Sequence, residues 1–509
     1  MADAYGYQGT PGAYYDNSGS LAAEISFGGP LTEFSCPATA PATSAPTTGA
    51  TPQPLGAYTP AYAPTTVSGQ PFRPLHTSGN QIVDSLGNVV RLKAVNWYGA
   101  ESADYVPMGL DKQSVTGIAS WIANHGFNAV RLPWSNELVE CNPTVSPQLV
   151  SPANSTFANH PAMWVFDQVV NALAQAGLMV ILDNHMTDAG WCCSDHDNNG
   201  LWWSSREYHS DYTDFQTGQA HWQADWATMV DRYASQPAVV GVDLRNEPRS
   251  AAYWGGTTAG VPDGSVADSS QQPPNSGPSP CPVQNSNLAC DWRAAAQAEG
   301  NIILGLDRNL LIFVEGTSYA TDLTGAYSSP VTLEQPSQLV YSPHVYAYSG
   351  YCNANARSQC PGGTVWEAGK DGHPPSFDFL ANWKDIGRGL DSQWGYLAES
   401  GDSLGTITPI FIGEFGTNAW NSPGHAVKIA RDSDQNRWII ALIKYLQNRQ
   451  PFGWAYWALN GTQSDGAPFD TSRVFGKQEI YGVLDTGWGA PPLPYYNTSL
   501  VKWLSTIGG

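Results

Sequence analysis

Charged residues are scarce in this sequence. Only 13% of the 509 residues are Asp, Glu, Lys or Arg, about half the usual share of a soluble protein. The few charges are mostly acidic, with 44 Asp and Glu against 23 Lys and Arg, giving a formal net charge of −21. Such a surface repels phosphate backbones and anionic lipid headgroups. The composition therefore argues against nucleic acid and membrane partners.

Long apolar runs are also missing. No segment reaches the roughly 18 consecutive apolar residues of a membrane-spanning helix, and Met1–Tyr5 is not followed by the apolar core of a signal peptide. We therefore expect no membrane span in this chain.

Cysteine is sparse, and its spacing excludes common zinc sites. The eight cysteines form no Cys-x-x-Cys or Cys/His pattern. Two pairs close in sequence are candidate disulfides, namely Cys281 with Cys290 and Cys352 with Cys360. Because disulfides persist mainly outside the cytosol, this usage favours a secreted, extracellular protein.

One loop resembles a calcium loop only in part. Residues 195–200 match its first ligand positions, but position twelve is Arg206, where a bidentate Glu is required. We expect a turn-rich loop there, with no metal and no cofactor in the protein. Cys192 and Cys193, just before it, either bridge each other or pair with separate partners.

The N-terminal region differs in composition from the rest. Residues 37–70 contain no charged residue and are dominated by Pro, Thr, Ala and Ser, which cannot bury enough apolar surface to fold. We therefore predict two parts: an N-terminal extension and Pro/Thr/Ala-rich linker over 1–70, and a catalytic domain over 71–509. The part played by residues 1–36 is left open.

From Gln81 onward, apolar strand-like runs alternate with helical stretches, the pattern of a parallel sheet with helices outside. A hairpin of 81–83 and 89–92 is placed to cover the bottom of a barrel. Eight strands are predicted at 92–97, 129–133, 179–184, 239–244, 310–315, 339–344, 409–414 and 453–458. Helices are predicted at 114–124, 163–176, 222–233, 292–303, 391–397, 435–447 and 499–505, with none evident between the fifth and sixth strands. The fold class is α/β, a (β/α)8 TIM barrel with long catalytic-face loops.

Two glutamates end apolar strands in the same way. Glu247 ends the run Val239–Pro248, and Glu414 ends the run Pro409–Gly416. If both strands belong to one sheet, the two carboxyl groups lie at one mouth, which suggests glycosidic chemistry. Each glutamate alone could instead cap a helix or pair with an arginine.

Aromatic residues are plentiful, at 20 Trp, 24 Tyr and 15 Phe. Their flat faces suit sugar rings, although most of them are expected to fill the core. At the strand ends they join polar residues in one set: Arg131, His185, Asn246, Glu247, His344, Tyr346, Glu414 and Trp457. Barrel enzymes build their active sites at these ends. Singly, most of these residues could be structural, but the set is specific.

This set resembles glycoside hydrolase family 5, the cellulase family, from about Leu92 to Trp488. The motifs that carry the resemblance are Arg131-Leu-Pro, Leu182-Asp-Asn-His, Leu244-Arg-Asn-Glu-Pro, Tyr341-Ser-Pro-His-Val-Tyr, Ile412-Gly-Glu-Phe-Gly and Trp454-Ala-Tyr-Trp. The resemblance implies a retaining enzyme that hydrolyses β-1,4-glucan chains internally and acts as a monomer.

The resemblance also implies roles for single residues. Glu247 would be the acid/base and Glu414 the nucleophile, which Arg131 and Tyr346 keep ionised and oriented. Asn246 would bind the sugar 2-hydroxyl, His185 and His344 would contact substrate, and Trp457 would stack on the sugar at the cleavage site.

Some features leave alternatives open. Trp254 begins a long loop after the fourth strand and is expected on the leaving-group side of the cleft. The motifs hold one sugar and do not read the linkage, so mannan, xyloglucan, a β-1,3- or β-1,6-glucan and a glucosyl lipid are alternative substrates. A carbohydrate-binding barrel without catalysis is a further alternative, although such a barrel usually lacks one of the glutamates.

Overall fold

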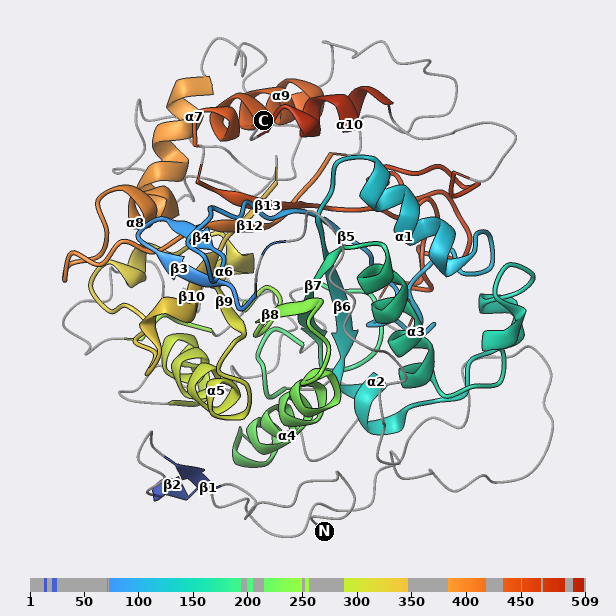
Figure 1. Ribbon diagram of the computed structural model, residues 1–509, viewed down its shortest axis with the longest axis horizontal. Helices are drawn as coiled ribbons and strands as arrows, with labels where there is room; N and C mark the ends of the chain where they lie inside the picture. The colour runs from blue at the N-terminus through green and yellow to red at the C-terminus, as the bar shows by residue number, and fades with distance from the viewer. Residues whose placement is uncertain are drawn as a thin grey trace, which may run out of the picture.

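The architecture is drawn from a computed structural model of the chain (Figure 1). It describes residues 13–15, 21–24, 71, 73–193, 199–204, 215–249, 252–255, 288–346, 383–417, 434–449, 451–467, 470–489 and 498–507. Several expectations therefore lie outside the described residues: the linker at 37–70, most of the calcium-like loop with Arg206, and Cys36, Cys281, Cys352 and Cys360.

Parallel strands form a barrel that closes on itself. The sheet order is β10-β9-β8-β7-β6-β5-β13-β12-β11. The strands are β5 (Lys93–Asn96), β6 (Ala129–Ser135), β7 (Met179–Met186), β8 (Val239–Asp243), β9 (Leu311–Glu315), β10 (Leu339–Ser342), β11 (His344–Val345), β12 (Phe411–Phe415) and β13 (Gly453–Tyr456).

The two ends of this sheet are halves of one barrel strand. Pro343 separates β10 from β11 and has no N–H for the ladder. The gap is bridged by the backbone N–H of Tyr341, which donates to Pro409 ahead of β12 at 3.1 Å. All eight predicted strands are thus present, and the predicted TIM barrel is confirmed.

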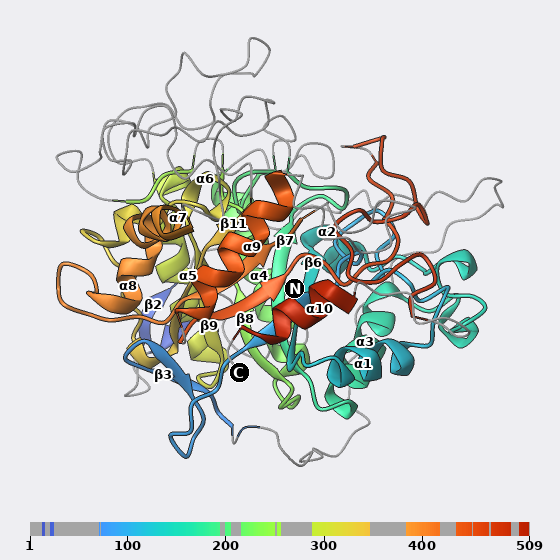
Figure 2. The same ribbon diagram turned by 90° about the horizontal axis from the view of Figure 1, so that it is seen from above.

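Helices surround the barrel (Figures 1 and 2). They are α1 (Val115–Asn124), α2 (Asn136–Cys141), α3 (Ala162–Gln175), α4 (Phe215–Tyr233), α5 (Trp292–Leu306), α6 (Thr317–Ala320), α7 (Trp383–Leu390), α8 (Tyr396–Glu399), α9 (Asp434–Gln447) and α10 (Thr498–Ser505). Side chains start several of them: Ser114 accepts from the Gly117 N–H in α1, and Asp291 accepts from the Ala294 N–H in α5.

The helices agree with the sequence, with two differences. Helix α2 was not predicted, and the predicted 391–397 helix is the middle of a longer helical segment that runs from α7 to α8. Between β9 and β10 there is only the four-residue α6 and short turns, as expected. No helix within the described ranges is long and apolar enough to cross a membrane.

The bottom of the barrel is filled by apolar side chains and closed by a hairpin. Strand β4 (Gln81–Val83) pairs with β3 (His76–Ser78), an element that the sequence did not reveal, and Val83 also bridges to Val89 as predicted. Leu75 and Ile82 from this region pack with interior residues such as Phe313 and Phe411. In Figure 2, β3 lies at the end of the barrel opposite α6.

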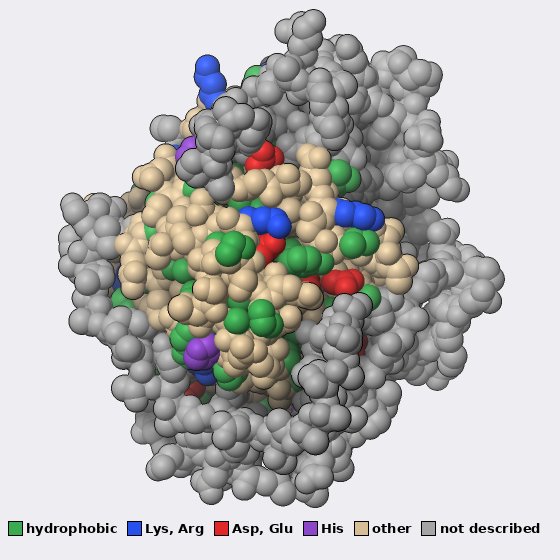
Figure 3. Space-filling model, turned by 90° about the vertical axis from the view of Figure 1, so that its right-hand side faces the viewer, with side chains coloured by type: hydrophobic (Ala, Val, Ile, Leu, Met, Phe, Trp, Pro, Cys, Tyr) green, Lys and Arg blue, Asp and Glu red, His purple; other side chains and the backbone are tan. Residues whose placement is uncertain are grey.

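Two further strands, β1 (Ala13–Tyr15) and β2 (Leu21–Glu24), pair antiparallel apart from the barrel, and β1 lies beside α5. On the face shown in Figure 3, charged side chains of the described surface are few and scattered, in keeping with the low charge content.

Candidate active site

Six of the barrel strands place a polar residue just above the apolar filling. Side chains alternate along a strand, so residues two apart point the same way. Two positions after the interior residue Ala129 comes Arg131. In the same way Asp183 follows Ile181, and Glu315 follows Phe313. The same step gives Asn96, Asp243 and Ser342 on β5, β8 and β10. The upper half of the barrel is therefore polar.

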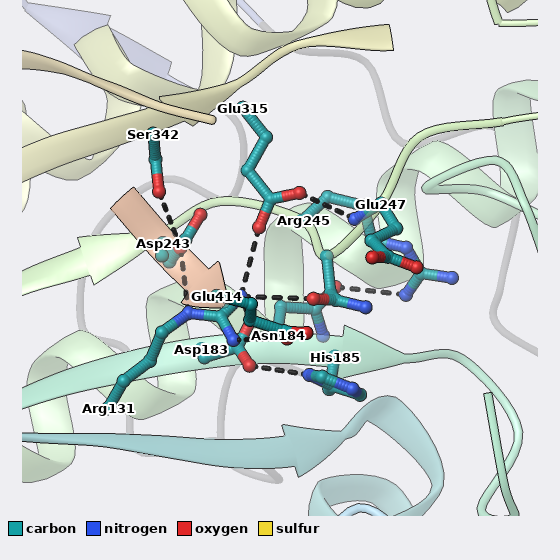
Figure 4. Close-up of polar contacts among 12 residues, drawn as sticks. Arg131, Asp183, Asn184, His185, Asp243, Arg245, Glu247, Glu315, Ser342 and Glu414 are labelled. Atoms are coloured by element: carbon teal, nitrogen blue, oxygen red, sulfur yellow. Dashed lines mark hydrogen bonds and ion pairs between the residues drawn. The ribbon is translucent and has the colours of Figure 1, made fainter. Parts of the chain in front are cut away.

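Arg131 is the centre of this polar layer (Figure 4). Its side chain is fully buried and its guanidinium donates to Asp243 (2.9 Å), Asn96 (3.1 Å), Glu414 (2.8 Å), Asn246 (3.1 Å) and Glu315 (2.9 Å). It also forms an ion pair with Asp183 at 3.0 Å. Burial by itself lowers the pKa of Arg131, but the surrounding carboxylates outweigh burial and raise it well above its usual value.

Glu414 lies in β12 and is held at both oxygens. Oε1 accepts from Arg131, and Oε2 accepts from the Tyr346 hydroxyl at 2.8 Å. The sequence placed these three residues together, and the structure brings them into contact.

Glu247 follows β8 and has a left-handed backbone, with φ of +49°. Such a conformation is unfavourable for a residue with a side chain and needs support from its surroundings. Glu315 supplies it by accepting the Glu247 N–H at 2.6 Å, while Arg249 donates to the Glu247 carbonyl at 3.1 Å. One oxygen of Glu247, one of Glu414 and one nitrogen of His344 lie within 4.8 Å of one another.

His344 stands between the two glutamates rather than at the rim. Its Nδ1 lies 3.1 Å from Glu247 Oε1 and 3.7 Å from Glu414 Oε2. Burial lowers the pKa of His344, but the attraction of Glu315 and Glu414 outweighs it and raises the pKa well above the usual value. Gly413 makes room for this ring, because a Cβ there would lie 2.8 Å from Nε2.

The pKa of His185 shifts in the opposite direction from that of His344. Nδ1 of His185 lies 2.6 Å from Asp183 Oδ2, and burial lowers the pKa of His185 to about 3. The ring is therefore neutral near neutral pH, and it can exchange hydrogen bonds with a hydroxyl group.

Trp457 lies at the end of β13, 6% exposed, among other rings. It stacks with Tyr98 at 5.1 Å and with His185 at 5.4 Å between ring centroids, and Trp191 meets it edge-on at 6.1 Å. Tyr98 is itself fixed by hydrogen bonds with Arg473 and Glu479. The loop after β13 therefore fixes the position of the Trp457 indole.

The sulfurs of Cys192 and Cys193 lie together near Asn246. Arg131 donates only, so the oxygen of the Asn246 amide faces Arg131 and the nitrogen faces the two sulfurs, at 3.5 and 3.7 Å. The two sulfurs thus lie beside the Asn246 amide nitrogen.

The expected role of Trp254 is not supported by its position. Its side chain is 7% exposed, its indole N–H donates to the Ser329 carbonyl at 2.8 Å, and its ring packs on Tyr341. The ring also fills the space beside Gly325, where a Cβ would lie 2.6 Å from it. Trp254 is therefore a packing residue, because both its polar and apolar parts are already engaged within the protein.

Several residues of the site were not singled out from the sequence. Asp183, Asp243 and Glu315 surround Arg131, and Tyr98, Arg473 and Glu479 support Trp457. Glu315 had a visible signal, because Leu311–Glu315 is an apolar strand ending in Glu, like the strands of Glu247 and Glu414. The Tyr98 contacts had none, since its partners come from a loop more than 370 positions away.

Among the described residues, three clusters of side chains are close enough together to hold a metal ion on distance alone. The first is Asp183, Asp243 and Glu315, the second is Glu247, His344 and Glu414, and the third is Cys192, Cys193 and Glu247. Arg131 already neutralises the first by direct contacts. In the second, His344 lies against both glutamates, and the attraction of Glu315 and Glu414 raises its pKa well above the usual value.

Comparison with known proteins agrees with this geometry. The family model "Cellulase (glycosyl hydrolase family 5)" matches residues 83–463. The chain belongs to glycosyl hydrolase family 5. It is accordingly an O-glycosyl hydrolase of the endoglucanase type.

Curated relatives cover most of this family 5 chain. An endoglucanase of Paenibacillus polymyxa is 28% identical over 401 residues, covering 77% of this chain and 80% of the relative. The major extracellular endoglucanase of Xanthomonas campestris pv. campestris is 25% identical over 439 residues, covering 83% of this chain and 72% of the relative.

Solved structures share the fold. The catalytic domain of the major Xanthomonas campestris endoglucanase has a TM-score of 0.59 at 22% identity, covering 86% of this chain and 99% of that one. An endocellulase from Pyrococcus horikoshii, in complex with cellotetraose, has a TM-score of 0.58 at 23% identity, covering 86% and 98%.

Proposed function

We propose that this enzyme is a secreted, retaining endo-β-1,4-glucanase in which Glu414 is the nucleophile and Glu247 the acid/base. The observation that carries the mechanism is the short separation of the two carboxyl groups, with one oxygen of each inside a 4.8 Å cluster. Retaining glycosidases place the pair about 5–5.5 Å apart, whereas inverting enzymes need about 6.5–9.5 Å to admit a water between them.

The first step is attack by Glu414 on the anomeric carbon. Arg131 and Tyr346 each donate to one of its oxygens, which leaves the carboxylate fixed in orientation. Glu247 gives its proton to the departing oxygen, so the chain is cleaved and a glycosyl-enzyme ester forms on Glu414.

The second step reverses these roles. Glu247, now ionised, takes a proton from a water molecule, and the water oxygen attacks the anomeric carbon and releases Glu414. Two displacements at one carbon restore the β configuration. Asn246 is oriented by Arg131 so that its amide N–H2 remains available to the 2-hydroxyl of the same sugar.

The remaining residues bind sugar. His185, neutral and hydrogen-bonded to Asp183, suits a sugar hydroxyl. Trp457 offers the part of its indole that the neighbouring rings leave uncovered. We infer a β-1,4-glucan substrate because the relatives are named endoglucanases and a neighbour in fold binds cellotetraose. Secretion is supported by the extracellular relative from Xanthomonas.

Hydrolysis of a panel of defined polysaccharides tests this proposal. Carboxymethyl-cellulose and mixed-linkage β-glucan should lose viscosity faster than reducing ends accumulate, as expected for internal cleavage. Mannan, xyloglucan and β-1,3- or β-1,6-glucan serve as alternatives, and preference for any of them would reassign the substrate. Proton NMR of the first product should show the β-anomer, and an α-anomer would reject the retaining mechanism.

A further inference from the structure

Glu315 is an acidic residue of the site to which the mechanism above gives no task. It ends β9, and its side chain is fully buried. Oε2 accepts the backbone N–H of Glu247 at 2.6 Å, and Oε1 accepts from Arg131 at 2.9 Å. Oε1 also lies 3.1 Å from Nε2 of His344. Glu315 therefore touches the backbone of one proposed catalytic residue and the ring that contacts both.

The position of His344 makes this last contact important. Nδ1 on one side of the ring faces Glu247 and Glu414, and Nε2 on the other side faces Glu315. An imidazolium beside Glu247 would favour loss of the proton that Glu247 must deliver to the leaving group. A negative partner on the far side of the ring cancels this effect.

The rest of the surroundings is fixed by other strands. The charged and titratable groups around the Glu315–His344 pair are Arg131, Asp183, His185, Asp243, Glu247 and Glu414. Arg131 is engaged by carboxylates on all three of its nitrogens. Glu315 is the group whose carboxylate lies against Nε2.

We propose that Glu315 is a positioning residue that acts as the counter-ion of His344 and so allows Glu247 to keep its proton. The pair has no net charge whether its proton lies on Nε2 or on Oε1. Burial raises the pKa of Glu315 to about 8, and the attraction of His344 opposes this rise. This inference rests on the proposed function, since it assumes that Glu247 is the acid.

The test is the pH profile of Glu315→Gln on two substrates. Gln keeps the size of the side chain and removes its charge, so a protonated His344 loses the negative charge that faces Nε2. On a soluble β-glucan, the basic limb of kcat/KM should move to lower pH by about 1–3 units, the usual effect of one charge at this range. With 2,4-dinitrophenyl β-cellobioside, whose leaving group needs no proton, kcat should change by less than about threefold.

A matched control is Glu299→Gln in α5, which removes an equally buried carboxyl group away from the site. It should leave both pH limbs unchanged. If Glu315→Gln instead lowers kcat/KM equally on both substrates and the pH limbs do not move, the proposal is wrong and Glu315 has only a structural role. If the wild-type enzyme cleaves neither substrate, the proposed function itself is wrong. That outcome is distinguishable from failure of the Glu315 proposal, in which the wild type remains active.

A second measurement does not use Glu315→Gln. In the wild-type protein labelled with 15N-histidine, the His344 signal, identified by its loss in His344→Asn, should show no neutralisation between pH 5 and 7. An ordinary transition near pH 6.5 would overturn the proposal, because it would show that no partner holds the proton on this ring.

Discussion

Arg131 and Glu414 are 283 positions apart in the sequence and form a buried ion pair, with 2.8 Å between Nη1 and Oε1. The same guanidinium also binds carboxylates from β7, β8 and β9. One cation therefore holds four barrel strands at the level of the site, and both stability and activity depend on it.

Replacing Arg131 should be severely destabilising. Arg131→Met removes the cation and leaves several buried carboxyl groups without a partner, and breaking a buried pair in this way costs about 3–5 kcal/mol. Urea denaturation measures the loss. Arg449→Met is the control, because Arg449 is about a quarter exposed and its ion pairs lie near the surface, where each contributes about 0–1 kcal/mol. Equal losses of unfolding free energy in the two variants would show that the network around Arg131 stabilises the protein no more than a surface ion pair does.

Trp457→Ala should lower kcat more than it raises KM. Stacking on a sugar that is distorted toward the transition state counts mainly in the chemical step. The loss should be similar for cellotriose-length and longer substrates, because the ring lies beside His185 at the cleavage point. Steady-state kinetics on a series of cello-oligosaccharides measures it.

Trp254→Ala is the matched control for this experiment. The side chain is buried to nearly the same degree but packs on Tyr341 and Gly325, so its removal should cost about 3–5 kcal/mol of stability. At a temperature where the variant remains folded, KM should be unchanged at every chain length. A selective effect on long substrates would restore Trp254 to the cleft.

The fold could be predicted from the sequence because the strands are continuous apolar runs that end abruptly. Parallel strands all end at one mouth, so Arg131, Glu247 and Glu414 could be grouped before any coordinates were known. Trp254 could not be placed, since a tryptophan in a loop is equally compatible with a sugar platform and with packing. The support of Trp457 by Arg473 through Tyr98 was also hidden, because only the folded chain brings these segments together.

The N-terminal 70 residues should be dispensable for hydrolysis of soluble oligosaccharides. A chain beginning at Pro71 keeps Leu75 and Ile82, which close the barrel floor, and should retain both Tm and kcat/KM. A chain beginning at Ser85 loses that floor and should melt at a lower temperature. Strand β1 lies beside α5. A drop in Tm for the first truncation would therefore show that the N-terminal segment stabilises the catalytic domain.

Stability should fall as pH rises from about 5 to 8. Burial raises the pKa of Glu101 to about 8, of Asp104 to about 7 and of Glu137 to about 7. In the unfolded chain such groups ionise near pH 4. Between these values the folded protein binds more protons than the unfolded one, so a rise in pH favours unfolding. His185, with its pKa lowered to about 3, opposes this trend only below about pH 6.5.

Melting curves from pH 5 to 9 measure this dependence. Glu101→Gln removes one titrating group, so its Tm should fall less steeply between pH 5 and 8 than that of the wild type. Glu334→Gln, at an exposed position, should follow the wild-type slope. Parallel slopes for all three proteins would contradict the assignment of the buried proton to Glu101.

The two glutamates should differ in how their loss can be rescued. Glu414→Gln should abolish formation of the glycosyl-enzyme for every substrate, because no other carboxylate is held by both Arg131 and Tyr346 among the residues that the structure describes. Glu247→Gln should retain the first step on aryl glycosides with good leaving groups, which need little protonation, and the intermediate should accumulate. Steady-state and burst kinetics on 2,4-dinitrophenyl β-cellobioside distinguish the two variants.

Added azide should then reactivate Glu247→Gln. The anion enters from the side that the Glu247 carboxylate normally occupies and attacks the anomeric carbon opposite Glu414, so the glycosyl azide should have the β configuration. A β-azide from Glu414→Gln, with no rescue of Glu247→Gln, would exchange the roles of the two glutamates, because a β product shows that the rescued variant still forms the covalent intermediate and has lost its acid/base.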